Sequence, residues 1–557
     1  MKSLKFIFLI TTIFSINISC SKDDQVTEIE EPGEIVQSTG ISADAFETYP
    51  GDLGLVLDTR EIAKKGYKPT KAEIIVAASE GDFSRTITID PISFMAQIKI
   101  SKEGLSEAVI AELTSGVNVS SIIKDENGNI LLTDEGTISF QPNPTAKTVN
   151  ANNLQETTEN AKLNLSEDTF YYFQVLDADG NPTNSSMMHN SNSGFDNVMW
   201  TNSDGTFNGN EISRNFSFIP VSGEPNTFFI KLRDGGRFLS MASLTQNSSA
   251  GGVFYQHLGP SISAATELSQ VQNNNNTKFK IVKLSDSVYE LQTYTGIPIR
   301  LASGIGLTTN SVVTSSSFSP PINSDPITWR LISTTIDWTV ENEGTTFLDP
   351  ILGQAITDFK FNSTLINCGQ GSLSQTVGVK DEEKENGTVG WEESLSINTT
   401  NSVGVSATVG VSFDAKFFGT GATYNASLTL NYNYSRSVTE TNSTFEEKSK
   451  EISKTTFAER TVTVPSGSAS LVYDAFQFYD STRINFVQRL RIRGVDSQTG
   501  QSLSGEEIRS QFHFSGFNGV ITAVDQNSIV ITLRGTTILD KIIETESNVQ
   551  NVAANCN

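Results

Sequence analysis

The chain has 557 residues, a formal net charge of −24, 41 glycines and only 18% charged residues. This length is more than one hydrophobic core usually spans, so two to four domains are expected. The many glycines and the low charge density favour an all-β protein with little helix. Because phosphate binding requires a basic surface and no cluster of Lys or Arg occurs, we expect no nucleic-acid partner.

Residues 1–19 have the pattern of a secretory signal peptide, with two lysines before an apolar run that is too short to cross a bilayer. The small residue before Cys20 resembles the cleavage box of bacterial lipoproteins, which implies that Cys20 becomes the acylated N-terminus. Asn17 departs from that box, because an aliphatic residue is usual three positions before the cysteine. A conventionally cleaved secretory protein is therefore the alternative.

Residues 20–40 are acidic, lack aromatic side chains and contain Pro and Gly, which predicts a disordered tether. With the leader, this predicts an exported protein that is lipid-anchored at the outer membrane or the cell surface, or released from it. In such a chain we expect an intrachain disulfide between Cys368 and Cys556, with free buried thiols as the alternative.

Residues 41–150 predict a small β-sandwich of immunoglobulin-like type, with a role as spacer or docking module. Short apolar or alternating runs follow one another, separated by turns such as Asp125-Glu126-Asn127-Gly128. Their number and spacing fit a sandwich. The runs are LGLVLD, AEIIVAA, RTITI, MAQIKI, SSIIK, NILLT and GTISF.

Residues 165–335 contain a weak internal repeat of three strand-turn-strand units, each with a glycine. Three strands carry an apolar pair, namely Phe216 with Phe218, Phe279 with Ile281, and Trp329 with Leu331. The region resembles a β-trefoil of the ricin-type and fascin-like folds, which implies a closed barrel with one such pair per lobe. The Gln-x-Trp signature of ricin-type lectins is absent, so sugar binding is implied by the fold class alone. Recognition of a glycan or another receptor and a spacer role both remain open.

Catalytic and metal-binding motifs are missing from the sequence. The three histidines, His189, His257 and His513, are far apart and have no companion motif. Neighbouring carboxylates such as Glu392 and Glu393 point to opposite faces of a strand and make poor acid/base pairs. The run from Asp177 to Asn181 lacks the distal Glu of a calcium loop, which favours a plain turn. We therefore expect no enzyme activity, no cofactor and no metal.

The segment Ser402–Val438 alternates strictly between apolar and uncharged polar residues on both sides of an aromatic, glycine-rich centre. Ordinary strands have about 5–6 residues, whereas a membrane-spanning strand needs roughly 9–11 with one apolar face. The pattern predicts a membrane-inserting hairpin over Leu395–Val438. Its apolar face comprises Val403, Val405, Val409, Val411 and Phe413 in the first arm, Tyr424, Leu428, Leu430, Tyr432 and Tyr434 in the second, and Phe417 and Phe418 at the tip.

A single hairpin cannot satisfy its backbone edges in lipid, so several copies of the chain are expected to close a barrel together. Residues 336–557 resemble the pore module of aerolysin-like β-pore-forming toxins. The likeness lies in a Ser/Thr-rich strand, an insertion loop with an apolar tip, a returning strand, and the proline-bearing strand from Thr461 to Pro465 before the run LVYDAFQFYD. It implies a protein that binds a receptor, oligomerises and inserts a shared barrel into a target membrane.

Some members of this family lose a C-terminal peptide on activation, and Arg534 and Lys541 are candidate cleavage sites. Two other functions use the same all-β modules. One is a non-lytic surface adhesin or glycan-binding lipoprotein, and the other is a polysaccharide-acting enzyme that brings distant carboxylates together.

Overall fold

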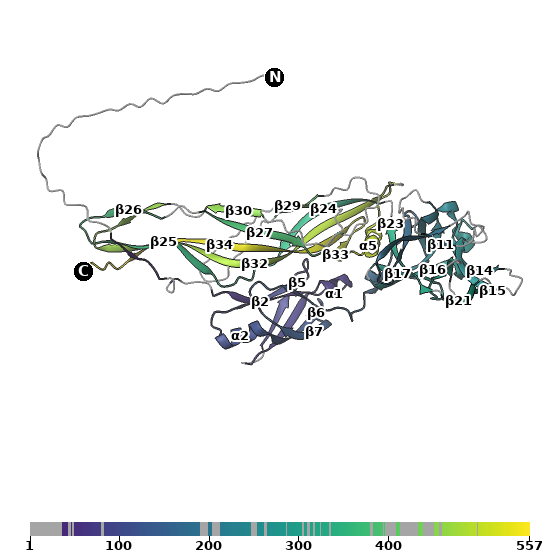
Figure 1. Cartoon of the computed structure of the whole chain (residues 1–557), viewed down its shortest axis with the longest axis horizontal. Helices are drawn as coiled ribbons and strands as arrows, with labels where there is room; N and C mark the ends of the chain where they lie inside the picture. The colour runs from purple at the N-terminus through teal and green to yellow at the C-terminus, as the bar shows by residue number, and fades with distance from the viewer. Residues whose placement is uncertain are drawn as a thin grey trace, which may run out of the picture.

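The structure is a computed structural model, and it describes residues 36–556 with internal gaps. The gaps are 43–45, 47–49, 80–82, 190–198, 203–211, 247–252, 261–264, 286, 303–305, 309–311, 316–317, 324, 334–335, 379–381, 394, 396–407, 413–432, 438–449, 456–458 and 498–499. Strands dominate the described chain and its helices are short, which confirms the all-β prediction. In Figure 1 a long sheet follows the longest axis, a barrel lies at one end, and the C-terminus lies at the other.

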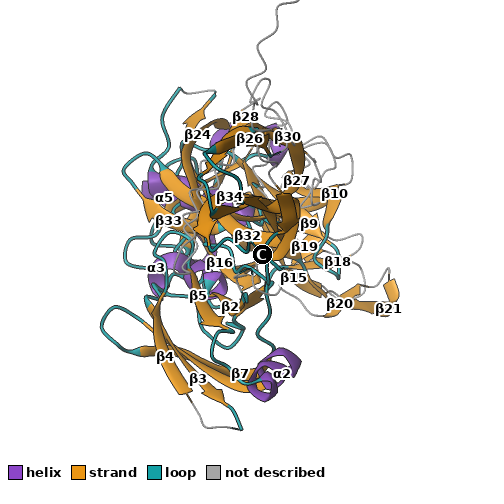
Figure 2. Cartoon of the chain, turned by 90° about the vertical axis from the view of Figure 1, so that its left-hand side faces the viewer, coloured by secondary structure: helices purple, strands orange, loops and turns teal. Residues whose placement is uncertain are grey.

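The N-terminal lobe packs a four-stranded sheet, β4-β3-β6-β7, and a three-stranded sheet, β5-β2-β8, around one core. Figure 2 shows β3, β4, β7 and α2 below the long sheet. The elements of the lobe are β2 (Asp52–Asp58), α1 (Arg60–Lys64), β3 (Lys71–Ala77), β4 (Phe83–Thr88), β5 (Met95–Ser101), α2 (Glu107–Ser115), β6 (Val117–Lys124), β7 (Ile130–Ile138), β8 (Ala146–Thr148) and, beyond the core, α3 (Thr158–Ala161).

Three features of this lobe were not predicted from the sequence. The runs NILLT and GTISF form one strand, β7, because the residues between them continue the pairing with β6. Helix α2 was not expected, and the side chain of Ser106 caps its N-terminus by accepting a hydrogen bond from the Val109 amide. Strands β2 and β8 pair in parallel.

Six strands form a closed barrel in the order β9-β12-β13-β16-β17-β23, because β23 pairs back onto β9. The three apolar pairs predicted from the repeat all lie in its single core. The strands are β9 (Tyr171–Leu176), β12 (Phe216–Pro220), β13 (Thr227–Leu232), β16 (Lys278–Ser285), β17 (Val288–Thr293) and β23 (Thr328–Ser333).

Further hairpins accompany the barrel. Strands β10 (Pro182–His189) and β11 (Met199–Asn202) extend its sheet beyond β9. A second, five-stranded sheet has the order β14-β15-β19-β18-β22. Its strands are β14 (Leu239–Gln246), β15 (Val253–Pro260), β18 (Arg300–Ala302), β19 (Gly306–Thr308) and β22 (Asp325–Pro326), beside the pair β20 (Val312–Ser315) and β21 (Phe318–Asn323) and the helix α4 (Leu268–Val271).

The long sheet has the strand order β1-β25-β32-β34-β27-β30, with β24 on β32 and β33 on β34. Its central strand β32 has 29 residues, which corresponds to about 95 Å at the usual rise of a strand. The strands are β1 (Val36–Thr39), β24 (Ile336–Phe347), β25 (Ile356–Asn367), β27 (Glu382–Trp391), β30 (Lys450–Thr455), β32 (Ser468–Asp496), β33 (Val520–Val524) and β34 (Ile529–Val552).

Strand β1 corrects the tether prediction at its C-terminal end. Residues 36–39 pair with Ser363–Ile366 of β25 and form the edge of the sheet. The Asn362 side chain extends this attachment, because it accepts a hydrogen bond from the Ile41 amide and donates one to the Ile41 carbonyl. The edge of β25 has unpaired backbone N–H and C=O groups, and hydrogen bonds to these groups stabilise a neighbouring polar segment as a strand. The rest of the predicted tether lies outside the described residues.

Two further links tie distant parts of the chain together. The predicted disulfide between Cys368 and Cys556 is confirmed, and it fixes the C-terminal tail to the end of β25. Helix α5 (Gly505–Phe514), between β32 and β33, begins at Ser504 with a capping box to Glu507. Its residue Phe512 lies in the core of the long sheet, whereas Phe514 lies in the core of the barrel.

Candidate functional site

The described part of the predicted hairpin consists of two short strands. Strand β28 (Thr408–Ser412) pairs antiparallel with β29 (Asn433–Ser437), and β28 lies beside β24. These strands hold the predicted site residues Val409, Val411 and Tyr434. The remaining predicted residues lie outside the described chain: Cys20, Val403, Val405, Phe413, Phe417, Phe418, Tyr424, Leu428, Leu430 and Tyr432.

The register of this ladder brings apolar positions of both arms together. Val411 lies opposite Tyr434, and Val409 lies opposite Arg436. Residues directly opposite in an antiparallel ladder share a face, so the Val409, Val411 and Tyr434 positions lie on one side. The other side has only small or uncharged polar residues, namely Thr408, Gly410, Ser412, Asn433, Ser435 and Ser437. Arg436, opposite Val409, is the one charged position on the apolar side of this ladder.

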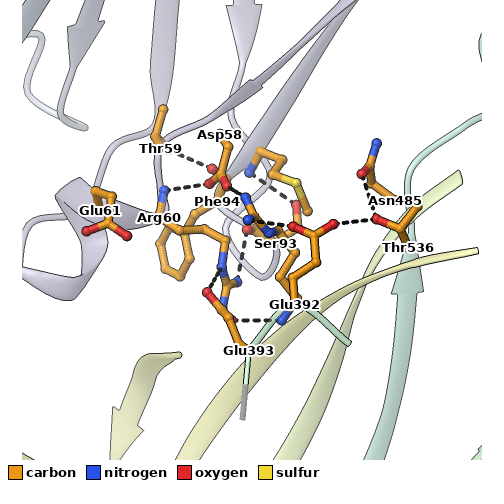
Figure 3. A network of polar contacts seen from close by, with 12 residues as sticks. Asp58, Thr59, Arg60, Glu61, Ser93, Phe94, Glu392, Glu393, Asn485 and Thr536 are labelled. Carbon is orange, nitrogen blue, oxygen red and sulfur yellow. Dashed lines mark hydrogen bonds and ion pairs between the residues drawn. The ribbon is translucent and has the colours of Figure 1, made fainter. Parts of the chain in front are cut away.

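A buried ion network lies where the first arm of the hairpin leaves the long sheet, between that sheet and the N-terminal lobe (Figure 3). Arg60 is 1% exposed and binds both carboxylate oxygens of Glu393: Nε donates to Oε1 at 3.2 Å and Nη2 donates to Oε2 at 2.5 Å. Its guanidinium also donates to the Thr532 hydroxyl at 3.0 Å and to the Thr532 carbonyl at 2.8 Å. One side chain of α1 therefore binds both β34 and the segment that follows β27.

Arg534 of β34 extends the network to two further carboxylates. Its guanidinium contacts Asp58, at the end of β2, and lies 2.6 Å from Glu392. Its backbone amide donates to Glu393 Oε2 at 2.8 Å. The hydroxyl of Thr536 donates to Glu392 Oε1 at 2.6 Å. Arg534 thus joins Glu392 through its guanidinium and Glu393 through its backbone amide.

The pKa values of the two most buried carboxyl groups of the network, Asp58 and Glu393, are shifted in opposite directions. Burial raises the pKa of Asp58, and the attraction of Arg534 only partly opposes this. Burial also acts to raise the pKa of Glu393, but the bidentate Arg60 and the nearby Lys64 outweigh it and hold that pKa below its usual range. Glu393 is therefore an ionised group whose burial depends on its cationic partners.

Apolar contacts fix the same stretch of chain to the sheet. The Trp391 indole packs edge-on against Phe486, with ring centroids 5.9 Å apart, and donates to Gln488 Oε1 at 3.0 Å. Leu395 is buried in the core of the long sheet. The first residue of the predicted hairpin and the residues just before it are thus held by packing, hydrogen bonds and ion pairs at once.

Sequence reasoning did not find Asp58, Arg60 or Arg534 as members of a site. The only local signal concerns Asp58 and Arg60: these two charged residues come at the end of the buried strand β2, directly after its apolar run. The structure places both suggested cleavage sites inside a paired strand. Arg534 and Lys541 lie within β34, which pairs with β32 along nearly its whole length, so removal of the following peptide would take away a central strand.

The structure places the three histidines on separate elements and Asp177 in a turn. His189 lies on β10 next to Asp234 and Arg237, His257 lies on β15, and His513 lies on α5. Burial, together with Lys283 and Arg509, lowers the pKa of His513 to about 3. Asp177 accepts hydrogen bonds from the amides of Asp179 and Asn181, as in a plain turn. Among the described residues no group of His, Cys, Asp and Glu could hold a metal ion.

Within the described part of the chain, no helix has the length and apolar character needed to span a bilayer.

No family model and no curated protein sequence matches the chain. Solved structures match at low similarity. The Mpp75Aa1.1 β-pore-forming protein of Brevibacillus laterosporus is 15% identical, with 49% of this chain and 85% of that chain covered and a TM-score of 0.27. The Bacillus thuringiensis toxin parasporin-2, which recognises cancer cells, is 13% identical over 40% of this chain and 76% of its own, with a TM-score of 0.16. A lamprey immune protein is 9% identical, with 94% of this chain and 100% of that chain covered and a TM-score of 0.24. Each of these three TM-scores is below 0.5, so none of these likenesses indicates what the chain does.

Proposed function

We propose that the chain is a pore-forming protein that inserts the hairpin Leu395–Val438 into a target membrane, as one of several identical subunits. The observation that carries this proposal is the separate two-stranded ladder of β28 and β29. Among the described pairings β28 pairs only with β29, outside the long sheet. The hairpin can therefore leave the body of the protein without breaking any described ladder of the long sheet.

The alternating sequence supports insertion in company rather than alone. One face of the hairpin is apolar and the other is uncharged and polar, which suits lipid on one side and a water-filled lumen on the other. A lone hairpin leaves two unpaired edges in lipid, and closure by further copies removes both. In this proposal the long sheet acts as an aerolysin-like pore module and the protein as a homo-oligomer.

The barrel serves as the receptor module in this proposal. A β-trefoil is expected to have six strands in a closed barrel, three of which carry an apolar pair. We propose a glycan as the receptor class. The N-terminal lobe, an immunoglobulin-like sandwich in this proposal, acts as a spacer that also holds the hairpin root. The protein acts by binding and insertion, without catalysis and without a cofactor or metal.

Dye release tests the pore. The protein without residues 1–20 is expected to release dye from vesicles made of target-cell lipids and glycolipids, and deletion of 402–438 is expected to abolish release while leaving vesicle binding intact. Leakage that survives the deletion, or no leakage from any vesicle, contradicts the proposal. Glycan binding without leakage would identify the adhesin alternative, and cleavage of the glycan would identify the enzyme.

Acylation of Cys20 tests the proposed anchor, which places the chain at the outer membrane or cell surface. Cells that express the full chain are expected to incorporate radiolabelled palmitate into it, and Cys20→Ser is expected to remove the label and release the protein into the medium. The Cys368→Ser variant is the control, since its cysteine belongs to the disulfide. Equal labelling of the wild type and Cys20→Ser would show conventional secretion or another anchor.

A further inference from the structure

A short N-terminal segment, residues 36–42 with Phe46, lies against the outer edge of β25, and we call it the strap. Its first four residues form β1, which pairs with the backbone of β25. A side chain of β25 reinforces this ladder, because the Thr364 hydroxyl donates a hydrogen bond to the Thr39 carbonyl at 3.2 Å. These two residues are 325 positions apart in the sequence, so only folding brings them together.

At Gly40 the strap turns from the edge of β25 onto one face of the long sheet. A Cβ atom at this position would overlap the Asn362 side chain, so the close approach requires glycine. Asn362 then binds both backbone groups of Ile41. This side-chain amide takes the place of one more backbone pair, after which the strap leaves the edge.

Phe46 closes an aromatic cluster on this face and is itself 5% exposed. Its ring stands edge-on to Phe359 at 5.3 Å and to Tyr473 at 5.4 Å, and those two rings are 6.0 Å apart. Leu471 and Ala475 of β32 complete the cluster. Without Phe46 an apolar patch of β25 and β32 would face solvent directly beside the edge.

Residues 336–557 cover the other sides of the same stretch of β25. Strand β32 pairs with its inner edge. The pair of β26 (Leu373–Val377) and β31 (Arg460–Val464) packs against Val472. Because Val472 and Tyr473 are neighbours on a strand, this pair and Phe46 lie on opposite faces of the sheet. Of these three covers, the strap alone comes from outside residues 336–557.

The two halves of the β25 edge are protected from other strands in different ways. In the first half Asp358 and Lys360 are charged, and the register shifts between Phe359 and Phe361. Charges and bulges both hinder an edge from pairing with another chain. In the second half, residues 362–367 are uncharged, lack proline and keep a regular register, and β1 covers four of them. The strap therefore covers the half of the edge that would otherwise accept a further strand.

The strap is held mainly by contacts at the surface. All four residues of β1 are exposed, and Val36 is 58% exposed. Backbone hydrogen bonds in such positions open at low cost. Among the described residues of the strap, Phe46 has the one buried side chain. The strap can therefore open while β25 stays paired with β32.

We propose that the strap is an autoinhibitory cover, and that a second copy of this chain takes its place on β25 when the subunits associate. This inference rests on the proposed pore function, which requires several copies of the chain. The net charge of −24 makes copies repel one another, whereas residues 362–367 carry no charge. At the uncovered edge and its apolar face, two copies meet through hydrogen bonds and apolar contacts instead of repulsion.

A disulfide across the strap tests this inference in the protein without residues 1–20. Ser38→Cys with Thr364→Cys joins two residues that lie opposite each other in the ladder of β1 and β25. Asn118→Cys with Thr137→Cys is the matched control, since these exposed side chains lie 3.2 Å apart on paired strands of the N-terminal lobe. Peptide mapping verifies each new bridge and the native one. Oligomers on vesicles are measured by chemical crosslinking beside dye release, before and after mild reduction, with wild-type protein given the same reductant.

The oxidised 38–364 variant is expected to form oligomers about tenfold more slowly than the oxidised 118–137 variant, because the state that accepts a second copy is closed. Reduction is expected to restore its rate. Equal rates for the two oxidised variants would overturn the role of the strap while leaving the pore function in place. Wild-type oligomers that release no dye would overturn the pore function and leave the strap inference standing. A wild type that never forms oligomers would overturn both.

Replacement of Phe46 tests the cover from the opposite direction. Phe46→Ala is expected to form oligomers about tenfold faster than the wild type, because it raises the fraction of open strap. Phe46→Leu keeps an apolar side chain over the cluster and is expected to stay near the wild-type rate. An unchanged rate for Phe46→Ala contradicts the inference.

A mixture of two single variants, Ser38→Cys and Thr364→Cys, shows where the strap goes in the oligomer. If a second copy displaces the strap, no disulfide is expected between the two chains. An interchain disulfide would show that the strap of one copy has moved to the β25 edge of the next, which would overturn its displacement by another part of the neighbour.

Discussion

Replacement of Arg60 by alanine is expected to lower the free energy of unfolding by about 3–5 kcal/mol. The loss arises because Glu393, 4% exposed, keeps its charge in the interior and loses its bidentate partner. The Thr532 carbonyl loses a donor as well. Chemical denaturation followed by tryptophan fluorescence measures the effect, since Trp391 lies beside the network.

An exposed ion pair on the same sheet supplies the control for Arg60→Ala. Arg493 contacts Glu341 at 2.6 Å, but both side chains are open to solvent, with exposed fractions of 39% and 53%. We expect Arg493→Ala to leave the midpoint of unfolding nearly unchanged, because water already solvates its partner. A loss as large as that of Arg60→Ala would show that burial of the network has no special energetic role.

The effect of Arg60→Ala is also expected to depend on pH, with a sign that follows from Glu393. In the native protein the depressed pKa of Glu393 contributes stability above the pKa of the unfolded chain, and this contribution is lost as the pH falls through the folded pKa. In the variant burial dominates and raises the folded pKa. The deficit is therefore expected to be full above the pKa of the unfolded chain, about 4.3, and to shrink as the pH falls from there through the depressed folded pKa of Glu393. A deficit that does not shrink on acidification below pH 4 contradicts this account.

The same variant links stability to insertion. Because Arg60 joins Glu393, two residues before the predicted hairpin, to Thr532 of β34, its removal is expected to speed dye release while it weakens the fold. A general loss of stability elsewhere would not single out the hairpin, so Phe514→Ala, described next, serves as the comparison. Faster release by Arg60→Ala alone would support the network as the element that retains the hairpin.

Replacement of Phe514 by alanine is expected to cost about 3–5 kcal/mol and to loosen the barrel rather than the long sheet. Phe514 belongs to α5, yet its ring packs edge-on against Tyr289 at 5.0 Å and Tyr171 at 6.2 Å in the barrel core. Arg330 of β23 holds the same helix end, since it donates to the carbonyls of Phe514 and Ser515. The truncation leaves a cavity at the point where the two bodies join.

Phe512→Ala is the matched control, because Phe512 lies two residues earlier on the same helix but in the core of the long sheet. Calorimetry measures the total loss, and hydrogen exchange locates it. In Phe514→Ala we expect faster exchange in β9 and β17, and in Phe512→Ala faster exchange in β32 and β33. Identical exchange patterns for the two variants would mean that α5 unfolds as one unit and does not couple two separate cores.

Local sequence patterns determined much of the architecture. Apolar alternation with a period of two indicated the strands of the N-terminal lobe, and the repeated apolar pairs of the barrel proved to share one core. The turns at Asp125 and Asp177 follow from side chains that accept hydrogen bonds from amides two residues on. These features depend on neighbours a few residues away, so a short window of sequence contains the whole interaction.

Only the tertiary structure decided how distant segments combine. Arg60 meets Glu393 across 333 residues, and Phe514 reaches a barrel whose strands end at Ser333. Nothing within either local sequence selects the partner. A buried guanidinium needs acceptors and a buried ring needs apolar neighbours, but these can come from any part of the chain. The alternation of Ser402–Val438 likewise fits every even register, and only the structure shows that Val411 lies opposite Tyr434. The sequence therefore determined the faces of the hairpin, and the tertiary structure decided the pairing of β28 with β29.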